Sequence, residues 1–215
     1  MLDNPYSIVY NVFWPMHEVI FDIETQRLFS DLDNFDPKGL GVSIVSAYIR
    51  KLDNENQEIE GEMFSFWEND LSNLWPHFQV ADRIIGFNSL SFDIPVLQGY
   101  TNLPLKKLNH FDIMLKFKDI AGHRISLNHL AIHNLGAQKT DVGTNAVLYY
   151  QKGDPESLKK LKEYCEADVK LTKDLYDFAK KEGKLKYQDK WNTKKEIEVD
   201  FSYPKPDPIS QESLF

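Results

Sequence analysis

Two carboxylates interrupt an apolar run near the start of the chain. Asp22 lies inside the segment Val19 to Ile23, and Glu24 follows two positions after it. Because side chains alternate along a strand, Asp22 and Glu24 would share one face with Ile20. Carboxylates held side by side among apolar residues repel each other unless a cation or a proton lies between them. The alternative is an edge strand that leaves both groups in water.

A third carboxylate lies on the apolar stripe of an expected long helix. The helix runs from Pro155 to Lys181, with Asp154 as its cap and Gly183 just past its end. Asp168 shares the stripe, with Tyr164 one turn before it. The other stripe residues are Leu158, Leu161, Leu171, Leu175 and Phe178. Such an acid needs a partner. The alternatives are a hydrogen-bonded structural aspartate and a helix that is rotated enough to expose Asp168.

A fourth carboxylate follows a short buried strand. Asn88 comes directly after the apolar residues 83–87, and Asp93 lies near the start of the next expected helix. Site residues are common at such positions. The alternative is a turn-forming Asn88 and a helix-capping Asp93.

Together these acids indicate metal chemistry. Asp22, Glu24, Asp93 and Asp168 supply the hard oxygen ligands that suit Mg²⁺ or Mn²⁺. A pair of such ions can hold both the attacking and the leaving oxygen of a phosphodiester displacement.

The elements that must position these residues follow an α/β pattern with a mixed sheet flanked by helices. Hydrophobic periodicity predicts strands over 17–25, 41–50, 60–66 and 83–87, and two short ones over 184–188 and 195–201 that close the domain. It predicts helices over 68–78, 91–100, 126–134, 144–150 and 155–181.

Composition is that of an ordinary globular chain. Its 215 residues include one cysteine, Cys165, which excludes an internal disulfide and a cysteine-rich zinc site. The net charge is −8, with a strongly acidic first hundred residues and a small positive excess after them, so a local basic groove is compatible with it. No segment has the length and polarity of a membrane span or a signal peptide, so we expect a cytoplasmic enzyme or binding module without a membrane partner.

The motifs in order resemble the DEDD superfamily of 3′–5′ exonucleases over roughly residues 17–201. Tyr164 and Asp168 are similar to the tyrosine subclass, because the histidine subclass would need His where this chain has Glu163. The resemblance implies a ribonuclease H-like fold with a mixed five-stranded sheet, like that of small prokaryotic proofreading-like exonucleases. It also implies two divalent metal ions, Mg²⁺ or Mn²⁺.

The resemblance assigns roles to single residues. Asp22 would bridge both metals, Glu24 and Asp168 would complete the site on the nucleophile side, and Asp93 would hold the second metal. Tyr164 would orient the attacking water.

Further residues are expected around the substrate. The resemblance puts the backbone of Thr25 and Gln26 near the terminal 3′ nucleotide and lets Asn88 shape the site. Phe92 is a candidate for stacking, with a core position as the alternative. Asp112 is interpreted as supporting or structural, and His123, Arg124 and Lys116 as phosphate contacts or ordinary surface residues.

The C-terminal residues differ in kind from the rest. Three prolines between Ser202 and Ser210 indicate an extended linker, so we place the end of the domain near Tyr203 and a flexible tail over 204–215. Its last five residues resemble the peptide by which bacterial replication and repair proteins bind the sliding clamp. The matching positions are Gln211, Ser213, Leu214 and Phe215. A frayed or folded-back tail is the alternative.

The function expected from these observations is a metal-dependent 3′–5′ exonuclease in DNA replication or repair, acting on single-stranded 3′ ends. The alternatives are an exoribonuclease that trims RNA and a non-catalytic adaptor that binds the clamp.

Overall fold

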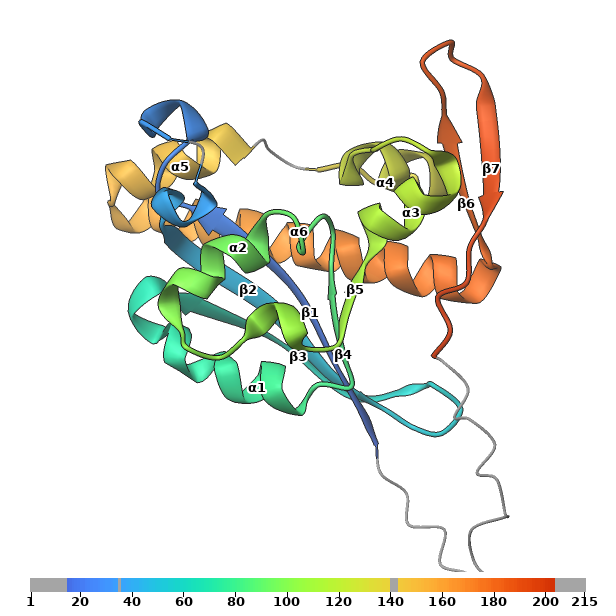
Figure 1. Ribbon diagram of the computed structural model, residues 1–215, viewed down its shortest axis with the longest axis horizontal. Coiled ribbons are helices and arrows are strands. Elements are labelled where there is room, and N and C mark those ends of the chain that lie inside the picture. The colour runs from blue at the N-terminus through green and yellow to red at the C-terminus, as the bar shows by residue number, and fades with distance from the viewer. Residues whose placement is uncertain (1–14, 35, 140–142, 204–215) are drawn as a thin grey trace, which may run out of the picture.

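A computed structural model describes residues 15–34, 36–139 and 143–203. Its centre is a mixed five-stranded sheet in the order β3-β2-β1-β4-β5 (Figure 1). β1 (Met16–Thr25), β2 (Val42–Leu52) and β3 (Glu58–Trp67) pair antiparallel, whereas β4 (Arg83–Gly86) and β5 (His110–Asp112) run parallel to β1. The expected α/β class and five-stranded mixed sheet are therefore confirmed.

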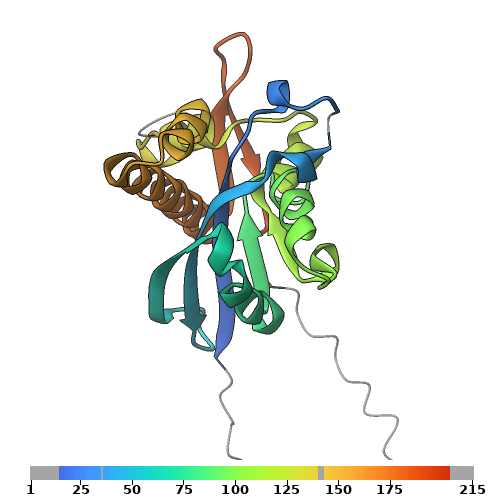
Figure 2. The same ribbon diagram turned by 90° about the vertical axis from the view of Figure 1, so that its left-hand side faces the viewer.

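Helices cover both faces of this sheet (Figure 2). On one side are α1 (Trp75–Val80) and α2 (Asp93–Leu97). The long α6 (Pro155–Glu182) crosses the other side, together with α3 (Ile113–Ala121) and α4 (Leu127–Leu135). The helix α5 (Gly143–Lys152) packs against the first half of α6. Short 3₁₀ turns lie at Phe29–Asp31, Pro37–Leu40, Glu68–Asn73, Gln98–Tyr100 and Leu105–Lys107. Within the described residues, no helix combines the length and the apolar character needed to cross a membrane.

The alternation expected for β1 is borne out and divides the core in two. Val19, Phe21 and Ile23 face α1 and α2, and the Phe21 ring lies 5.0 Å from that of Phe78. Ile20 faces the α6 side. β1 is the central strand of the sheet, so the alternative of a solvated edge strand for Asp22 and Glu24 is wrong.

The long helix follows its sequence signals closely. The Asp154 side chain accepts a hydrogen bond from the Ser157 amide at the start, and Gly183 ends the helix with a φ of 66°, in the left-handed region that glycine adopts without strain. The Cys165 thiol donates to the carbonyl oxygen of Asp22 at 3.5 Å, which brings the middle of the helix against β1.

Three expectations about the elements need correction. The fifth sheet strand is β5, which no periodicity marked, whereas β6 (Lys184–Gln188) and β7 (Lys194–Glu198) pair only with each other in a separate hairpin sheet. The strand expected over 195–201 is β7, which begins one residue earlier, at Lys194, and ends at Glu198. The expected helix 68–78 is a 3₁₀ turn followed by α1, with Pro76 in the first turn of α1. The expected helix 91–100 begins at Asp93 and tightens after Leu97.

Candidate metal centre

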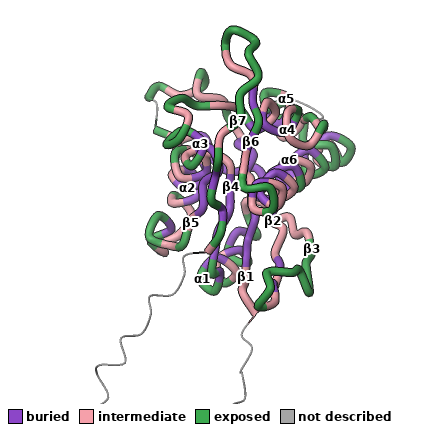
Figure 3. The backbone as a smooth tube through the Cα atoms, turned by 90° about the vertical axis from the view of Figure 1, so that its right-hand side faces the viewer, coloured by how far each residue is buried: buried purple, intermediate pink, exposed green. Residues whose placement is uncertain are grey.

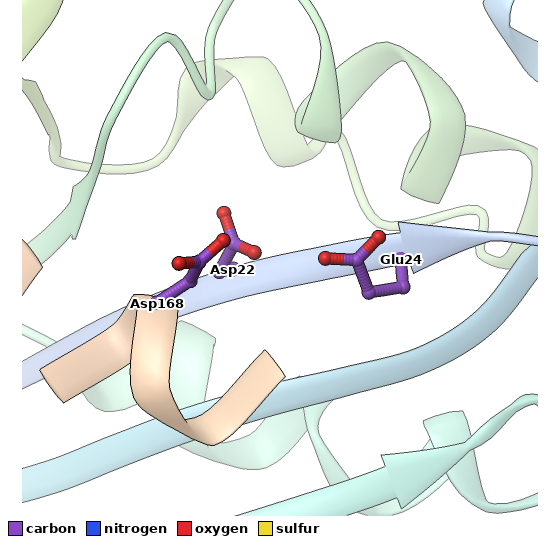
Figure 4. Close-up of side chains that lie close together, drawn as sticks. All are labelled: Asp22, Glu24 and Asp168. Atoms are coloured by element: carbon purple, nitrogen blue, oxygen red, sulfur yellow. The ribbon is translucent and has the colours of Figure 1, made fainter. Parts of the chain in front are cut away.

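Three of the predicted carboxylates converge between β1 and α6. Asp22 and Glu24 project from the same face of β1, and Asp168 reaches toward them from α6 (Figure 4). Each can offer one oxygen so that all three atoms lie within 4.8 Å of one another. Glu24 and Asp168 are buried, whereas Asp22 stays partly open to solvent. Convergence of Asp22, Glu24 and Asp168, inferred from strand and helix periodicity, is therefore present in the structure.

The donor atoms fit a divalent cation. Asp168 Oδ1 is buried without a hydrogen-bond partner among the described residues, while its Oδ2 accepts from Lys139 Nζ. A buried carboxylate oxygen without a partner is costly unless an ion or a water completes its coordination. Clustered carboxylate oxygens with an open approach are the ligands that Mg²⁺ and Mn²⁺ prefer.

The pKa values of Asp22 and Glu24 show that the nearby positive charge does not balance the clustered carboxylates. Burial raises the pKa of Asp22 well above its ordinary value, and repulsion from Asp168, Asp93 and Glu24 adds to the rise. Burial and the Asp168 charge raise the pKa of Glu24 to about 8. Lys139 opposes both shifts. A cation bound among these groups would relieve both the burial and the repulsion.

Glu18 on the same strand face shows how the fold treats a structural carboxylate. It is fully buried, and its Oε2 accepts from Arg50 Nε at 2.7 Å. Its Oε1 accepts from the hydroxyls of Tyr176 at 3.0 Å and Tyr203 at 2.7 Å. The chain thus provides an arginine for Glu18 and only the partial compensation of Lys139 for Asp22 and Glu24. This difference along one strand separates a structural acid from the candidate ligands.

Asp93 lies at the first position of α2, close enough for its charge to raise the pKa of Asp22, but outside the tight group of three. Burial raises the pKa of Asp93 to about 7 and the nearby Asp112 charge acts in the same direction, while hydrogen bonds from the amides of Asp93 and Ile23 oppose the rise. Its separation from the group of three is compatible with a second metal position. The alternative from the sequence, an acid that accepts from backbone amides at a helix start, also has support, because the Asp93 carboxylate accepts from its own amide.

The loop before Asp93 is held by Asp112. The Asp112 carboxylate accepts from the amides of Asn88 at 2.9 Å, Leu90 at 3.0 Å and Leu115 at 3.1 Å. Asn88 has a φ of 66°, and its side-chain oxygen accepts from Arg124 Nη2. Asp112 is therefore a supporting residue, in agreement with its interpretation from the sequence. Asn88 therefore forms the turn, as the alternative from the sequence proposed, and its side chain also contacts the Arg124 guanidinium.

Tyr164 belongs to the same site. Its side chain is buried, and its hydroxyl interacts with the Asp168 carboxylate one turn further along α6. Burial raises the pKa of Asp168, and the interactions with Lys139 and Tyr164 oppose that rise. Burial and the charges of Asp168, Glu24 and Asp22 raise the pKa of the Tyr164 hydroxyl, so it remains a proton donor at neutral pH.

Sequence reasoning missed Lys139, the last residue of the second described range. Its ammonium pairs with Asp168 and lies 5.6 Å from the centre of the Tyr164 ring. Burial lowers the pKa of Lys139, but Asp22, Asp168 and Glu24 outweigh this and raise it. No periodicity marks a lysine in a connecting segment, so only the tertiary structure could reveal it.

The predicted substrate residues have internal contacts. Thr25 Oγ1 donates to the Arg27 carbonyl at 2.9 Å, and Gln26 Nε2 donates to the Val42 carbonyl at 2.8 Å. Phe92 packs edge-on against Phe29 with ring centres 6.0 Å apart, on the rim of the core. The core alternative for Phe92 therefore has direct support.

The three basic candidates separate in the structure. Arg124 contacts Asn88 beside the site, and His123 next to it packs on Phe117 and Tyr187. Lys116 lies over the Phe111 ring. Lys116 also lines a cavity, together with Asp82, Arg83, Asn109, His110, Phe111 and, near the end of the described chain, Asp200, Ser202 and Tyr203. The predicted tail contacts of Gln211, Ser213, Leu214 and Phe215 lie outside the described residues.

Metal binding should depend on pH in a direction set by these pKa values. Burial and the Asp168 charge raise the pKa of Glu24 from its ordinary value of 4.5 to about 8 in the folded protein. The contribution of Glu24 to metal-free stability is therefore complete below about pH 4.5 and is lost as pH rises through about 8. Metal requires the deprotonated acid, so the melting-temperature increase caused by Mn²⁺ should grow between pH 6 and 8. Thermal melts with Mn²⁺ or EDTA check this. An increase that is the same at both pH values would contradict it.

Comparison with solved structures identifies the fold. The structure is similar to the family B DNA polymerase from the hyperthermophilic archaeon Pyrobaculum calidifontis, with a TM-score of 0.51 and 16% identity over 77% of this chain and 25% of the polymerase chain. The chain therefore spans about a quarter of that polymerase, and at this identity the likeness shows the fold alone. A zinc-bound E. coli ExoI–ssDNA complex is also similar, with a TM-score of 0.43 and 14% identity over 78% of this chain and 41% of ExoI, which is too weak to support an argument.

Comparison at the level of sequence gives the family. No curated protein matches the chain. A family model described as RNase_H superfamily matches residues 19–180. This range includes β1 from Val19 onward, with Asp22 and Glu24, and nearly all of α6, with Asp168. The sheet order and the carboxylates at its centre agree with that match, and the chain belongs to the RNase H superfamily.

Proposed function

We propose that this protein is a divalent-metal-dependent 3′–5′ exonuclease of the DEDD superfamily, tyrosine subclass, that acts on single-stranded DNA ends. The observation that carries the proposal is the convergence of Asp22, Glu24 and Asp168 in a chain of the RNase H superfamily. The nearby Asp93 and Tyr164 complete the residue set that this subclass requires.

The residues have distinct tasks in this proposal. Asp22, Glu24 and Asp168 would hold one divalent ion, and Asp22 together with Asp93 would hold a second. Bound ions of this kind lower the pKa of an attacking water and offset the charge on a leaving oxygen. The Tyr164 hydroxyl, which stays protonated, orients that water. Asp112 fixes the loop between Asn88 and Asp93 by accepting hydrogen bonds from its backbone amides.

Lys139 fits the proposal as a temporary counter-ion. Its ammonium offsets part of the negative charge while the carboxylates lack a metal. A side chain that is partly exposed and flexible can leave Asp168 when a divalent ion binds, since the ion then supplies the compensating charge.

The experiment that tests the activity uses matched single-stranded DNA and RNA labelled at the 5′ end. We expect a DNA ladder that shortens from the 3′ end with Mn²⁺ or Mg²⁺ and is absent with EDTA. Faster loss of RNA would favour an exoribonuclease. No cleavage of either strand would favour a non-catalytic adaptor.

The tail supports DNA as the substrate. We propose that residues 211–215 bind the bacterial sliding clamp, because Leu214 and Phe215 can enter an apolar pocket while the proline-rich linker gives reach. Deleting residues 211–215 should abolish clamp binding in a pull-down and leave cleavage of free oligonucleotides intact. Unchanged clamp binding after the deletion would contradict this part of the proposal.

A further inference from the structure

The hairpin formed by β6 and β7 presents an aromatic ring to solvent. Trp191 at its tip is 74% exposed, more than the other exposed large apolar side chains among the described residues. Asp189 shapes the tip, because its Oδ1 accepts from the amides of Trp191 and Thr193, both at 2.9 Å. Asn192 completes the turn with a φ of 61°. The ring is therefore held outward on an ordered turn.

One lysine contacts this ring, and further lysines lie along the two strands that carry it. Lys190 Nζ lies 4.4 Å from the centre of the Trp191 ring. Lys186, Lys194 and Lys195 are exposed along the two strands, and a shallow cavity beside them is lined by His133, Lys186, Tyr187, Lys194, Lys195 and Glu196. Figure 3 shows that the outer part of the hairpin is exposed. An exposed indole among lysines is suited to a ligand that has both flat rings and negative charges.

The hairpin is fixed to the body of the molecule. Asn134 of α4 exchanges two hydrogen bonds with the backbone of Lys186, both at 2.8 Å. His129 Nε2 accepts from the Gln188 amide at 3.0 Å. The buried Tyr187 packs its ring 5.1 Å from that of Phe117. Such anchoring keeps the position of Trp191 defined relative to α3 and α4.

A chain of contacts leads from the candidate metal centre to this hairpin. Arg124 bonds to Asn88 on the loop that precedes Asp93, and His123, its neighbour, packs 5.5 Å from the Tyr187 ring of β6. Figures 1 and 2 show the hairpin projecting beyond α4. A strand that leaves the metal centre past Arg124 and His123 would thus be directed toward the lysines of the hairpin.

We propose that the β6–β7 hairpin binds the single-stranded nucleic acid upstream of the reacting end, with Trp191 stacked on an unpaired base and Lys186, Lys190 and Lys194 on backbone phosphates. An unpaired strand fits because stacking on a side chain needs a free base face, which a duplex hides. The proposal rests on the nucleic-acid substrate inferred above, and it adds the site that holds the body of that substrate.

The test measures binding of a fluorescein-labelled oligo-dT of about 20 nucleotides, in EDTA, by fluorescence anisotropy. Trp191→Ala should raise Kd by about 5- to 150-fold, the loss expected for one stacked base. Trp191→Phe should restore part of the affinity, and Lys190→Gln should reduce the salt dependence by about one counterion. Val80→Ala, which removes an exposed apolar side chain on α1, is the matched control. Equal Kd values for Trp191→Ala and wild type would overturn the proposal.

Cleavage assays separate this proposal from the proposed catalytic function. With metal present, the loss of kcat/KM in Trp191→Ala should be larger for the long oligonucleotide than for a tetramer. If wild type cleaves and both lengths lose equally, or not at all, the hairpin proposal fails and the exonuclease stands. If wild type cleaves nothing but binds the oligonucleotide through Trp191, the exonuclease fails and the hairpin proposal stands.

Discussion

Asp22→Asn should abolish metal-dependent cleavage. Asp22 is the one acid that the proposal assigns to both ions, and an amide offers a neutral oxygen where a charged one is required. We expect cleavage to fall on the order of a thousandfold or more, which corresponds to about 4 kcal/mol of lost transition-state stabilisation. Quantitative gel assays of 5′-labelled DNA check this value.

The same substitution should stabilise the metal-free protein. Burial and three neighbouring acids raise the pKa of Asp22, so its ionised form opposes folding near neutral pH. Removing that charge should raise the melting temperature in EDTA and remove most of the increase that Mn²⁺ causes in wild type. Asp119→Asn, on the exposed side of α3, should change neither property. A destabilised and still active Asp22→Asn enzyme would contradict the assignment.

Arg50→Met should have the opposite effect on stability without touching the metal centre. The Arg50 guanidinium pairs with buried Glu18 at 2.6 Å and with Asp177 at 2.7 Å. Removing it leaves Glu18 buried without its cation, and breaking such a pair costs about 3–5 kcal/mol. Urea denaturation measures this loss as a fall in the free energy of unfolding.

A matched control for Arg50 is next to it on β2. Lys51 forms an exposed pair with Glu60, and Lys51→Met should change the free energy of unfolding by no more than about 1 kcal/mol. The double variant Glu18→Gln, Arg50→Met should recover part of the loss, because no charge is then left buried. Equal effects of Arg50→Met and Lys51→Met would show that the Glu18–Arg50 pair is not a structural ion pair.

Asp22 and Glu18 lie on one face of β1 but should have opposite effects on stability. Loss of charge at Asp22 should stabilise the metal-free fold and remove activity, whereas loss of the counter-ion of Glu18 should destabilise the fold. The carboxylates kept for metal binding lower the stability of the metal-free fold, whereas the Glu18–Arg50 pair raises stability.

The parts of the site that sequence could predict are those set by local periodicity. Alternation along β1 put Asp22 and Glu24 on one face, and helical spacing put Asp168 and Tyr164 on the buried stripe of α6. The helix caps at Asp154 and Gly183 are equally local.

The parts that sequence could not predict depend on contacts between distant segments. Lys139 meets Asp168 across 29 positions from a segment without regular pattern. β5 has only three residues, too few to show a period, and its place at the sheet edge comes from pairing with β4. The sequence predicts strands over 184–188 and 195–201, but periodicity does not reveal that they pair with each other, away from the main sheet, and contact α4.

The measurement that tests the central claim most directly is calorimetric titration of Mn²⁺ into the wild type, Asp22→Asn and Asp119→Asn. If Asp22, Glu24 and Asp168 form a metal centre, wild type and Asp119→Asn should bind Mn²⁺ saturably and with equal affinity, and Asp22→Asn should lose that binding. Equal Mn²⁺ binding by all three proteins, or none by wild type, would contradict a metal centre at these carboxylates.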